Sequence, residues 1–148
     1  MVEAAYEPSP WDWVKDQVEK IESSGGTEGT TLMETGWSVI VVTMIGVKTG
    51  AIRKVPLMRV EHAGEYAVIG SIGGAPENPK WVANVRANPN VAIQDGPDKR
   101  DYVLRELPEG DERATWWGRA VEAYPPYAEY QEKTDRRIPV FIAAPVAP

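Results

Sequence analysis

Four cations lie close together in one segment of an otherwise acidic chain. Residues 35–60 contain Lys48, Arg53, Lys54 and Arg59 but no Asp or Glu, although the chain of 148 residues has a formal net charge of -6. Clustered cations beside glycine backbone N–H groups favour phosphate or carboxylate ligands. The segment therefore predicts a site for a small anionic ligand. On turn chemistry alone, an ordinary hairpin turn with solvated cations is an equally good interpretation.

A glycine-rich segment at residues 70–74, with the sequence GSIGG, is the second candidate for ligand contact. Its glycines allow backbone N–H groups to approach a flat ring or a phosphate, and the hydroxyl of Ser71 can hydrogen-bond a cofactor or substrate. Taken by itself, GSIGG is more typical of a strand that ends in a flexible loop.

Three tyrosines recur every third residue near the C-terminus, where Tyr124, Tyr127 and Tyr130 surround Pro125 and Pro126. At this spacing two or three phenols can line one side of a broken helix and present aromatic surface with polar tips to a pocket. The alternative is a tyrosine cluster that only seals the end of a barrel.

The rest of the side-chain inventory excludes several classes of chemistry. The chain has no cysteine and one histidine, His62, which lies at a predicted hairpin turn where a solvated side chain is expected. We therefore predict no metal site and no cysteine or Ser-His-Asp nucleophile. The acidic balance argues against a nucleic-acid partner. An enzyme with so few reactive side chains needs an organic cofactor to carry out the chemistry. Hydride transfer fits this description, because the protein needs only a pocket that holds the hydride donor and acceptor close together.

Three segments of the chain together suggest a family. They are GVKTGAIRKVPL, GSIGGAPENPKWVANVRANP and AYPPYAEYQEKTDRRIPV. In order and spacing they resemble the deazaflavin-dependent nitroreductase family of actinobacteria, including mycobacteria, whose members reduce substrates with the reduced deazaflavin coenzyme F420. The resemblance extends from about Gly46 to the C-terminus.

The resemblance implies which residues bind the coenzyme and which face the substrate. The matched tyrosines Tyr124, Tyr127 and Tyr130 lie beside the substrate in the family, and together with Ser71 they are the expected catalytic residues. The implied coenzyme contacts, with the first four holding the anionic side chain, are Lys48, Thr49, Gly50, Arg53, Lys54, Pro56, Leu57, Gly70, Ser71, Ile72, Gly73 and Gly74.

Two positions depart from the family pattern. The family usually has an arginine where Val47 stands and often a lysine where Ile72 stands. Loss of two cations weakens phosphate binding, since each charge-assisted contact is worth roughly 1.5–3 kcal/mol. Arg53 and Lys54 are the cations that can compensate.

Hydrophobic periodicity and turn residues predict an α+β chain. We expect an N-terminal amphipathic helix and linker in residues 1–31 and one barrel domain in residues 32–148. The first three strands should form a meander, and Asn78 should cap the helix that follows them. Mostly antiparallel strands with peripheral helices indicate a small closed or split β-barrel, and the resemblance implies an FMN-binding-like split barrel. The predicted helices are 11–23, one beginning near 79, 109–123 and a short one after 126; the predicted strands are 39–43, 54–61, 66–71, 91–94, 101–107 and 138–143.

The leading functional hypothesis is an oxidoreductase that transfers a hydride from reduced F420 to an electron-poor small molecule such as a quinone, an activated enone or a nitroaromatic. An FMN-dependent oxidoreductase on the same barrel and a non-catalytic cofactor-binding or lipid-binding protein are the alternatives. We expect a cytoplasmic protein, since the chain shows no signal peptide and no long apolar run. Weak membrane association through the N-terminal helix and the oligomeric state stay open.

Overall fold

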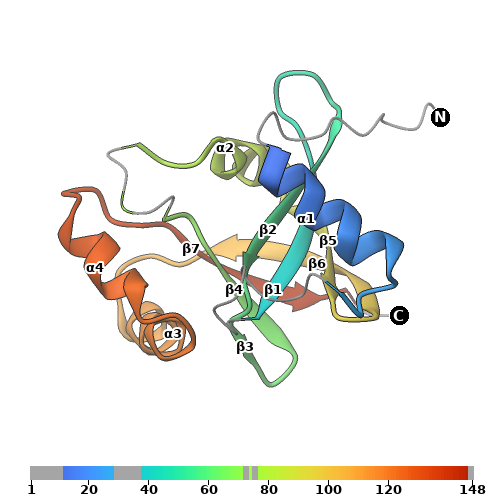
Figure 1. Cartoon of the computed structure of the whole chain (residues 1–148). Helices are drawn as coiled ribbons and strands as arrows, with labels where there is room; N and C mark the ends of the chain where they lie inside the picture. The colour runs from blue at the N-terminus through green and yellow to red at the C-terminus, as the bar shows by residue number, and fades with distance from the viewer. Residues whose placement is uncertain (1–11, 29–37, 72–73, 75–76, 147–148) are drawn as a thin grey trace.

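The computed structural model describes residues 12–28, 38–71, 74 and 77–146, and it forms a curled antiparallel sheet with helices around it (Figure 1). The seven strands follow the order β2-β1-β5-β6-β7-β4-β3, with every neighbouring pair antiparallel. The elements in chain order are α1 (Asp12–Ser23), β1 (Val39–Ile45), β2 (Ile52–Met58), β3 (Glu61–His62), β4 (Glu65–Ile69), α2 (Lys80–Ala87), β5 (Asn90–Asp95), β6 (Asp98–Glu106), α3 (Asp111–Ala123), α4 (Pro126–Glu132) and β7 (Val140–Pro145).

Side chains on the inner face of the sheet fill the barrel. Successive residues of a strand point to opposite faces, so alternate positions of β1, β4 and β7 enter this core. Ile40 and Val42 of β1, Val68 of β4 and Phe141 of β7 belong to it. The helix α2 closes one end of the barrel, because its buried residues Trp81, Val82 and Val85 pack into the same core.

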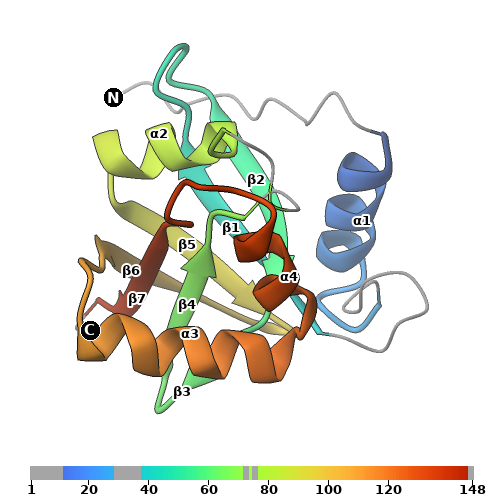
Figure 2. The ribbon, with the colours of Figure 1, turned by 90° about the vertical axis from the view of Figure 1, so that its left-hand side faces the viewer.

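The intervening strand residues face outward and are covered by helices on two separate sides. The outer face of β4 and β7 packs against α3 and α4, and this second core includes Trp116, Tyr124 and Tyr127. The outer face of β1 packs against Val18 and Ile21 of α1. Figure 2 shows α3 and α4 in front of the sheet and α1 at its side. The sheet thus supports a helical layer on each of two outer surfaces.

The split-barrel prediction is confirmed, but the predicted meander of the first three strands is wrong. The third strand of that prediction corresponds to β4, which lies between β7 and the two-residue β3 rather than beside β2; of the predicted second strand, only its last residue, Glu61, pairs with β4. The predicted strand 54–61 is also interrupted at Arg59 and Val60 between β2 and β3. Pro56 lies in β2 and has no N–H to donate, which suits an edge strand that has a hydrogen-bonded neighbour on one side.

The N-terminal helix forms as predicted, and its apolar side is covered by the sheet. Val14, Val18 and Ile21 are buried, and the last two pack against Val39 and Val41 of β1. The apolar side of α1, which a membrane-surface helix would insert into the lipid, is therefore already packed against the sheet. No helix in the described part of the chain is long and apolar enough to cross a membrane. The proposed domain boundary at residue 31 lies outside the described residues.

The loop after α1 approaches the β5–β6 turn so closely that one position requires glycine. Gly26 has a φ of +82°, and a Cβ atom built there would lie 1.7 Å from the carbonyl oxygen of Gly96. The preceding Gly25 also has a positive φ, +67°, but nothing lies within 4 Å of its Cβ position. A side chain at Gly25 would therefore introduce backbone strain alone, whereas a side chain at Gly26 would also introduce a steric clash.

Replacing each of these glycines by alanine is expected to give unequal losses of stability. Gly25→Ala introduces only left-handed backbone strain, which costs about 1–2 kcal/mol. Gly26→Ala adds a clash that separates the loop from the β5–β6 turn, so its loss of unfolding free energy should be clearly larger. Urea unfolding of both variants measures the difference. Equal losses would contradict the close packing of this loop.

Candidate active site

The turn between β1 and β2 holds the first predicted coenzyme residues at one end of the barrel. Lys48, Thr49 and Gly50 are exposed at its tip. The turn is fixed at its start because the N–H of Val47 donates to Asn84 Oδ1 of α2 at 2.9 Å. Thr49 Oγ1 in turn accepts the N–H of Ala51 at 3.2 Å. Asn84, which sequence reasoning did not single out, thus orients the tip that carries Lys48.

The predicted contacts in β2 divide between the two faces of the strand. Arg53 lies opposite Met44, whose side chain belongs to the barrel core, whereas Lys54 lies opposite Thr43. Leu57 packs against the same barrel core, and Pro56 lies opposite Val41, which packs under α1. Arg53 and Leu57 therefore share one face and Lys54 and Pro56 the other, so the structure does not bring all four to one surface.

Although residues 35–60 contain no Asp or Glu, Lys54 and Arg59 of the four clustered cations have carboxylate partners from other parts of the chain. Lys54 Nζ lies 2.7 and 2.8 Å from the two carboxylate oxygens of Glu22 at the end of α1. Arg59 Nε donates to Asp95 Oδ2 at 2.8 Å. Both carboxylates come from elements more than 30 residues away in the chain. The sequence of residues 35–60 alone therefore could not predict these two ion pairs.

The glycine-rich segment lies directly against the helix that carries the last tyrosine. Ser71 is buried, and its carbonyl oxygen accepts the N–H of Gly74 at 3.0 Å. Gly74 has a φ of +78°, and a Cβ atom there would lie 2.5 Å from the carbonyl oxygen of Tyr130. Only glycine allows this approach. Ile72 and Gly73 lie outside the described residues.

The three predicted tyrosines form one cluster. The hydroxyl groups of Tyr124 and Tyr130 hydrogen-bond each other at 2.8 Å. The ring of Tyr127 packs edge-on against both, with centroids 4.9 Å from Tyr124 and 6.2 Å from Tyr130. Tyr127 is only 3% exposed, whereas Tyr130 is half-buried. Within the cluster, Tyr127 is the packing centre and the Tyr124–Tyr130 pair offers the polar groups.

Burial raises the pKa of two phenols in this cluster. Desolvation, followed by the hydrogen bond and charge of Tyr130, raises the pKa of Tyr124 to about 12. Desolvation also raises the pKa of Tyr127, with smaller contributions from Tyr124 and Tyr130. A neutral phenol can donate a hydrogen bond to an oxygen atom, and a phenolate cannot. Tyr124 is therefore a hydrogen-bond donor at physiological pH rather than a base.

Sequence reasoning missed Arg136, which holds the loop after β4. Its guanidinium donates to the carbonyl groups of Gly70 and Ser71 and to the side chain of Asn78. The prediction that Asn78 caps α2 is wrong, because the residue before the helix is Pro79 and no side-chain cap forms. The sequence DRRIP contains two adjacent arginines, and nothing in it distinguishes Arg136 from its neighbour.

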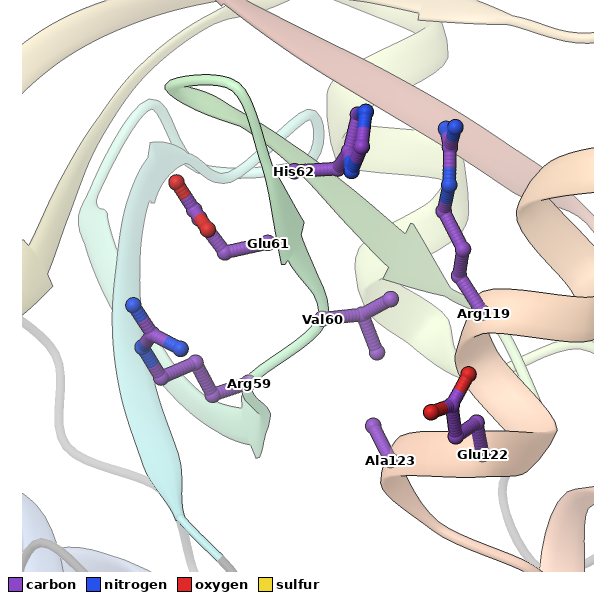
Figure 3. Close-up of a pocket in the computed structure, with 7 residues that line it drawn as sticks. All are labelled: Arg59, Val60, Glu61, His62, Arg119, Glu122 and Ala123. Carbon is purple, nitrogen blue, oxygen red and sulfur yellow. The ribbon is translucent and has the colours of Figure 1, made fainter.

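A cavity of about 410 Å³ lies beside the tyrosine cluster without including it. It is bounded by the corner between β2 and β3 and by α3, and Figure 3 shows Val60 directed toward that helix. Val60 shares the second core with Tyr124. His62, also at the cavity, packs edge-on against Trp116 with ring centroids 6.2 Å apart. The lining residues are Arg59, Val60, Glu61, His62, Arg119, Glu122 and Ala123.

Metal ligands do not gather anywhere in the described ranges. No group of three or more His, Cys, Asp or Glu residues there could hold an ion.

The donor set at the α2 end of the barrel suits an anionic organic coenzyme. In Figure 2 the β1–β2 turn, α2 and the connection from α4 to β7 all lie toward this end, away from β3. Lys48 supplies a positive charge and Thr49 a hydroxyl group at the turn. The Val47 N–H already donates to Asn84, so this backbone donor is not available to an anion at the turn.

The curled antiparallel sheet with its peripheral helices is a split β-barrel. An FAD-binding protein from Mesorhizobium loti shares the fold, with a TM-score of 0.55 over 74% of this chain and 79% of that chain at 17% identity. At that identity the likeness concerns the fold alone.

Sequence comparison identifies the family. The sequence profile of the F420H(2)-dependent quinone reductases matches residues 13–145, and the chain belongs to this family. A solved F420-H2 dependent reductase, FDR-A, is 57% identical, with a TM-score of 0.68 over 72% of this chain and 93% of that chain. The F420H(2)-dependent quinone reductase Rv1261c of Mycobacterium tuberculosis is 32% identical over 99 residues, or 66% of each chain.

The chain is thus an F420H2-dependent reductase, and the resemblance seen in its motifs is confirmed. Nothing in the comparisons favours the FMN-dependent alternative. The residues that contact coenzyme and acceptor stay predictions.

Stability should fall as the pH rises from about 10 to 12. The folded pKa of Tyr124 is raised from 10.0 to about 12, so in this window the unfolded chain ionises while the folded chain stays protonated. Ionisation then favours the unfolded state, and the stabilisation present below pH 10 is lost. Urea midpoints measured across this range should decline less steeply in Tyr124→Phe. Identical slopes in both proteins would contradict the raised pKa.

Proposed function

We propose that the protein transfers a hydride from reduced F420 to an electron-poor small molecule at the α2 end of the barrel, beside Tyr124 and Tyr130. The observation that carries this proposal is the packing of Gly74 against the main chain of Tyr130. It supports a site in which the segment expected to follow the deazaflavin ring meets the segment expected to face the acceptor. Such closeness of donor and acceptor is what hydride transfer requires.

The proposed coenzyme site combines the β1–β2 turn with the loop after β4. Lys48 and Thr49 hold the anionic side chain of the coenzyme, and Asn84 keeps their turn in place. Ser71 and its neighbouring glycines lie along the ring system. When bound, reduced F420 supplies the hydride and the protein supplies orientation and electrostatics.

Lys54 contributes to this site in competition with Glu22. Its ammonium group already has a carboxylate partner at 2.7 Å, and both side chains are largely covered. An anionic coenzyme must share Lys54 with that carboxylate. Arg53, on the opposite face of β2, would approach the coenzyme only near the turn, where its side chain lies against Gly46.

The acceptor class follows from the tyrosine cluster. Its rings offer an apolar wall, and the hydroxyl groups of the Tyr124–Tyr130 pair can donate to a carbonyl or nitro oxygen as negative charge develops there. Quinones, activated enones and nitroaromatics all carry such an oxygen. The deeply buried Tyr127 supports the two hydroxyl groups by packing.

The decisive test is a titration of the purified protein with the deazaflavin coenzyme, followed by tryptophan fluorescence. FMN is the control ligand, and menadione is added to the complex with reduced coenzyme. We expect saturable quenching by the deazaflavin, little by FMN, and oxidation of the coenzyme that depends on menadione. Tight binding without oxidation by any acceptor would favour a binding protein, and preference for FMN would overturn the proposal.

Charge variants test the proposed anion contacts. Lys48→Gln should raise the coenzyme Kd by about tenfold, since it removes one charge-assisted contact. Glu22→Gln should lower the Kd because it releases Lys54 from its carboxylate partner. Both effects should shrink at high salt.

A third variant, Lys99→Gln, controls for the change in net charge. Lys99 is an exposed residue of β6, next to the β5–β6 turn and away from the proposed site. The coenzyme Kd of the Lys99→Gln variant should match that of the unchanged protein. If Lys48→Gln and Lys99→Gln have the same effect, the β1–β2 turn does not bind the coenzyme.

A further inference from the structure

One arginine connects the two ends of the loop that follows β4. Arg136 Nη1 donates to the carbonyl oxygen of Gly70 at 3.1 Å and to Asn78 Oδ1 at 2.8 Å. Its Nη2 donates to the carbonyl oxygen of Ser71 at 2.7 Å. Gly70 and Ser71 begin the loop, and Asn78 precedes α2 at its end. A single guanidinium group therefore spans the loop.

The connection that carries Arg136 is itself held in place. The side chain of Gln131 donates to the carbonyl oxygen of Arg136 at 2.8 Å and accepts the N–H of Ile138 at 3.1 Å. The N–H of Arg136 donates to Thr134 Oγ1 at 3.3 Å. The main chain on both sides of Arg136 is thus fixed by the end of α4, and the guanidinium approaches the loop from a defined direction.

The geometry of the contacts requires a planar, forked donor. Three acceptors on two separate parts of the chain are reached by two nitrogen atoms of one side chain. A lysine ammonium is a compact point charge and cannot reproduce this fork. Desolvation lowers the pKa of Arg136, but a guanidinium stays charged at physiological pH, so the hydrogen bonds remain charge-assisted.

Arg136 also determines which way the peptide between Gly70 and Ser71 faces. In a planar trans peptide the carbonyl and N–H groups point in opposite directions. Because the Gly70 carbonyl points to Arg136, the N–H of Ser71 points away from it. The Ser71 carbonyl, held by the same guanidinium, accepts the N–H of Gly74, and Gly74 in turn lies on Tyr130.

We propose that Arg136 is a positioning residue for the coenzyme, holding the Gly70–Ser71 peptide and Asn78 in the conformation that receives the deazaflavin ring. This inference rests on the proposed function, which takes the ring to lie along residues 70–74. Arg136 acts through the loop and touches neither coenzyme nor acceptor. Through Gly74 it also sets the spacing between the coenzyme loop and the tyrosine cluster.

The test compares Arg136→Gln, Arg136→Lys and Asn78→Ala with a matched control. Arg137→Gln removes the adjacent arginine, which forms a 3.5 Å ion pair with exposed Glu109. For each protein we would measure the coenzyme Kd by fluorescence, kcat, the KM values for coenzyme and menadione, and amide hydrogen exchange.

Arg136→Gln should raise the coenzyme Kd by about tenfold to a hundredfold, because charge-assisted hydrogen bonds are lost. The KM for menadione should change less. Amide exchange should accelerate in residues 70–78 and stay unchanged in β1 and β2. Arg136→Lys should not restore binding, and Asn78→Ala, which removes one of the three contacts, should raise the Kd severalfold. Arg137→Gln should behave like the unchanged protein.

Several results would overturn the inference. One is an unchanged Kd in Arg136→Gln, and another is full rescue by Arg136→Lys, which would mean that charge alone is needed. Faster exchange throughout the sheet would assign Arg136 a general structural role. If Arg136→Gln does not fold, an unchanged coenzyme Kd in Asn78→Ala would also overturn the inference. Failure of the unchanged protein to bind the deazaflavin would instead reject the proposed function, and the inference with it.

Discussion

The architecture depends on the two-residue alternation of strands that are buried on both faces. Each of β1, β4 and β7 contributes one set of side chains to the barrel interior and the other set to an outer core beneath helices. A shift of one residue in β4 would exchange Ala67 and Ile69 with Tyr66 and Val68 and disrupt the packing of both cores at once. The register of β4 also decides where the strand ends, and therefore where the loop containing Ser71 begins.

Much of the secondary structure was predictable because its signals are local. The glycine-containing turn between β1 and β2, the apolar stripe of α1 and the proline break before α4 each depend on neighbouring residues. The partner of β4 was not predictable in this way. One neighbour, β3, is adjacent in the chain, but the other is β7, more than 70 residues later, and the pairing with β7 gives β4 apolar cores on both of its faces.

The candidate site shows the same division between local and distant information. The tyrosine spacing correctly predicted a cluster, since Tyr124, Tyr127 and Tyr130 are close in sequence and in space. The charge pattern was a poorer guide, because Glu22 and Asp95 reach Lys54 and Arg59 from distant elements. The role of Arg136 could not be predicted from the sequence either. Its acceptors lie more than 50 residues away, and two of them are main-chain carbonyl groups, which every residue possesses.

The chain has no cysteine and one histidine. The protein therefore contributes mainly by positioning its ligands and by burying the groups that contact them, rather than through reactive side chains. Burial of Tyr124 favours the neutral phenol, and a neutral phenol is the form that can donate to a developing negative charge. The packing that seals the outer core also raises the pKa of this donor. The barrel-sealing and substrate-facing interpretations of the tyrosine cluster are therefore compatible, because Tyr127 at the centre provides the desolvation and the half-buried Tyr130 provides the access.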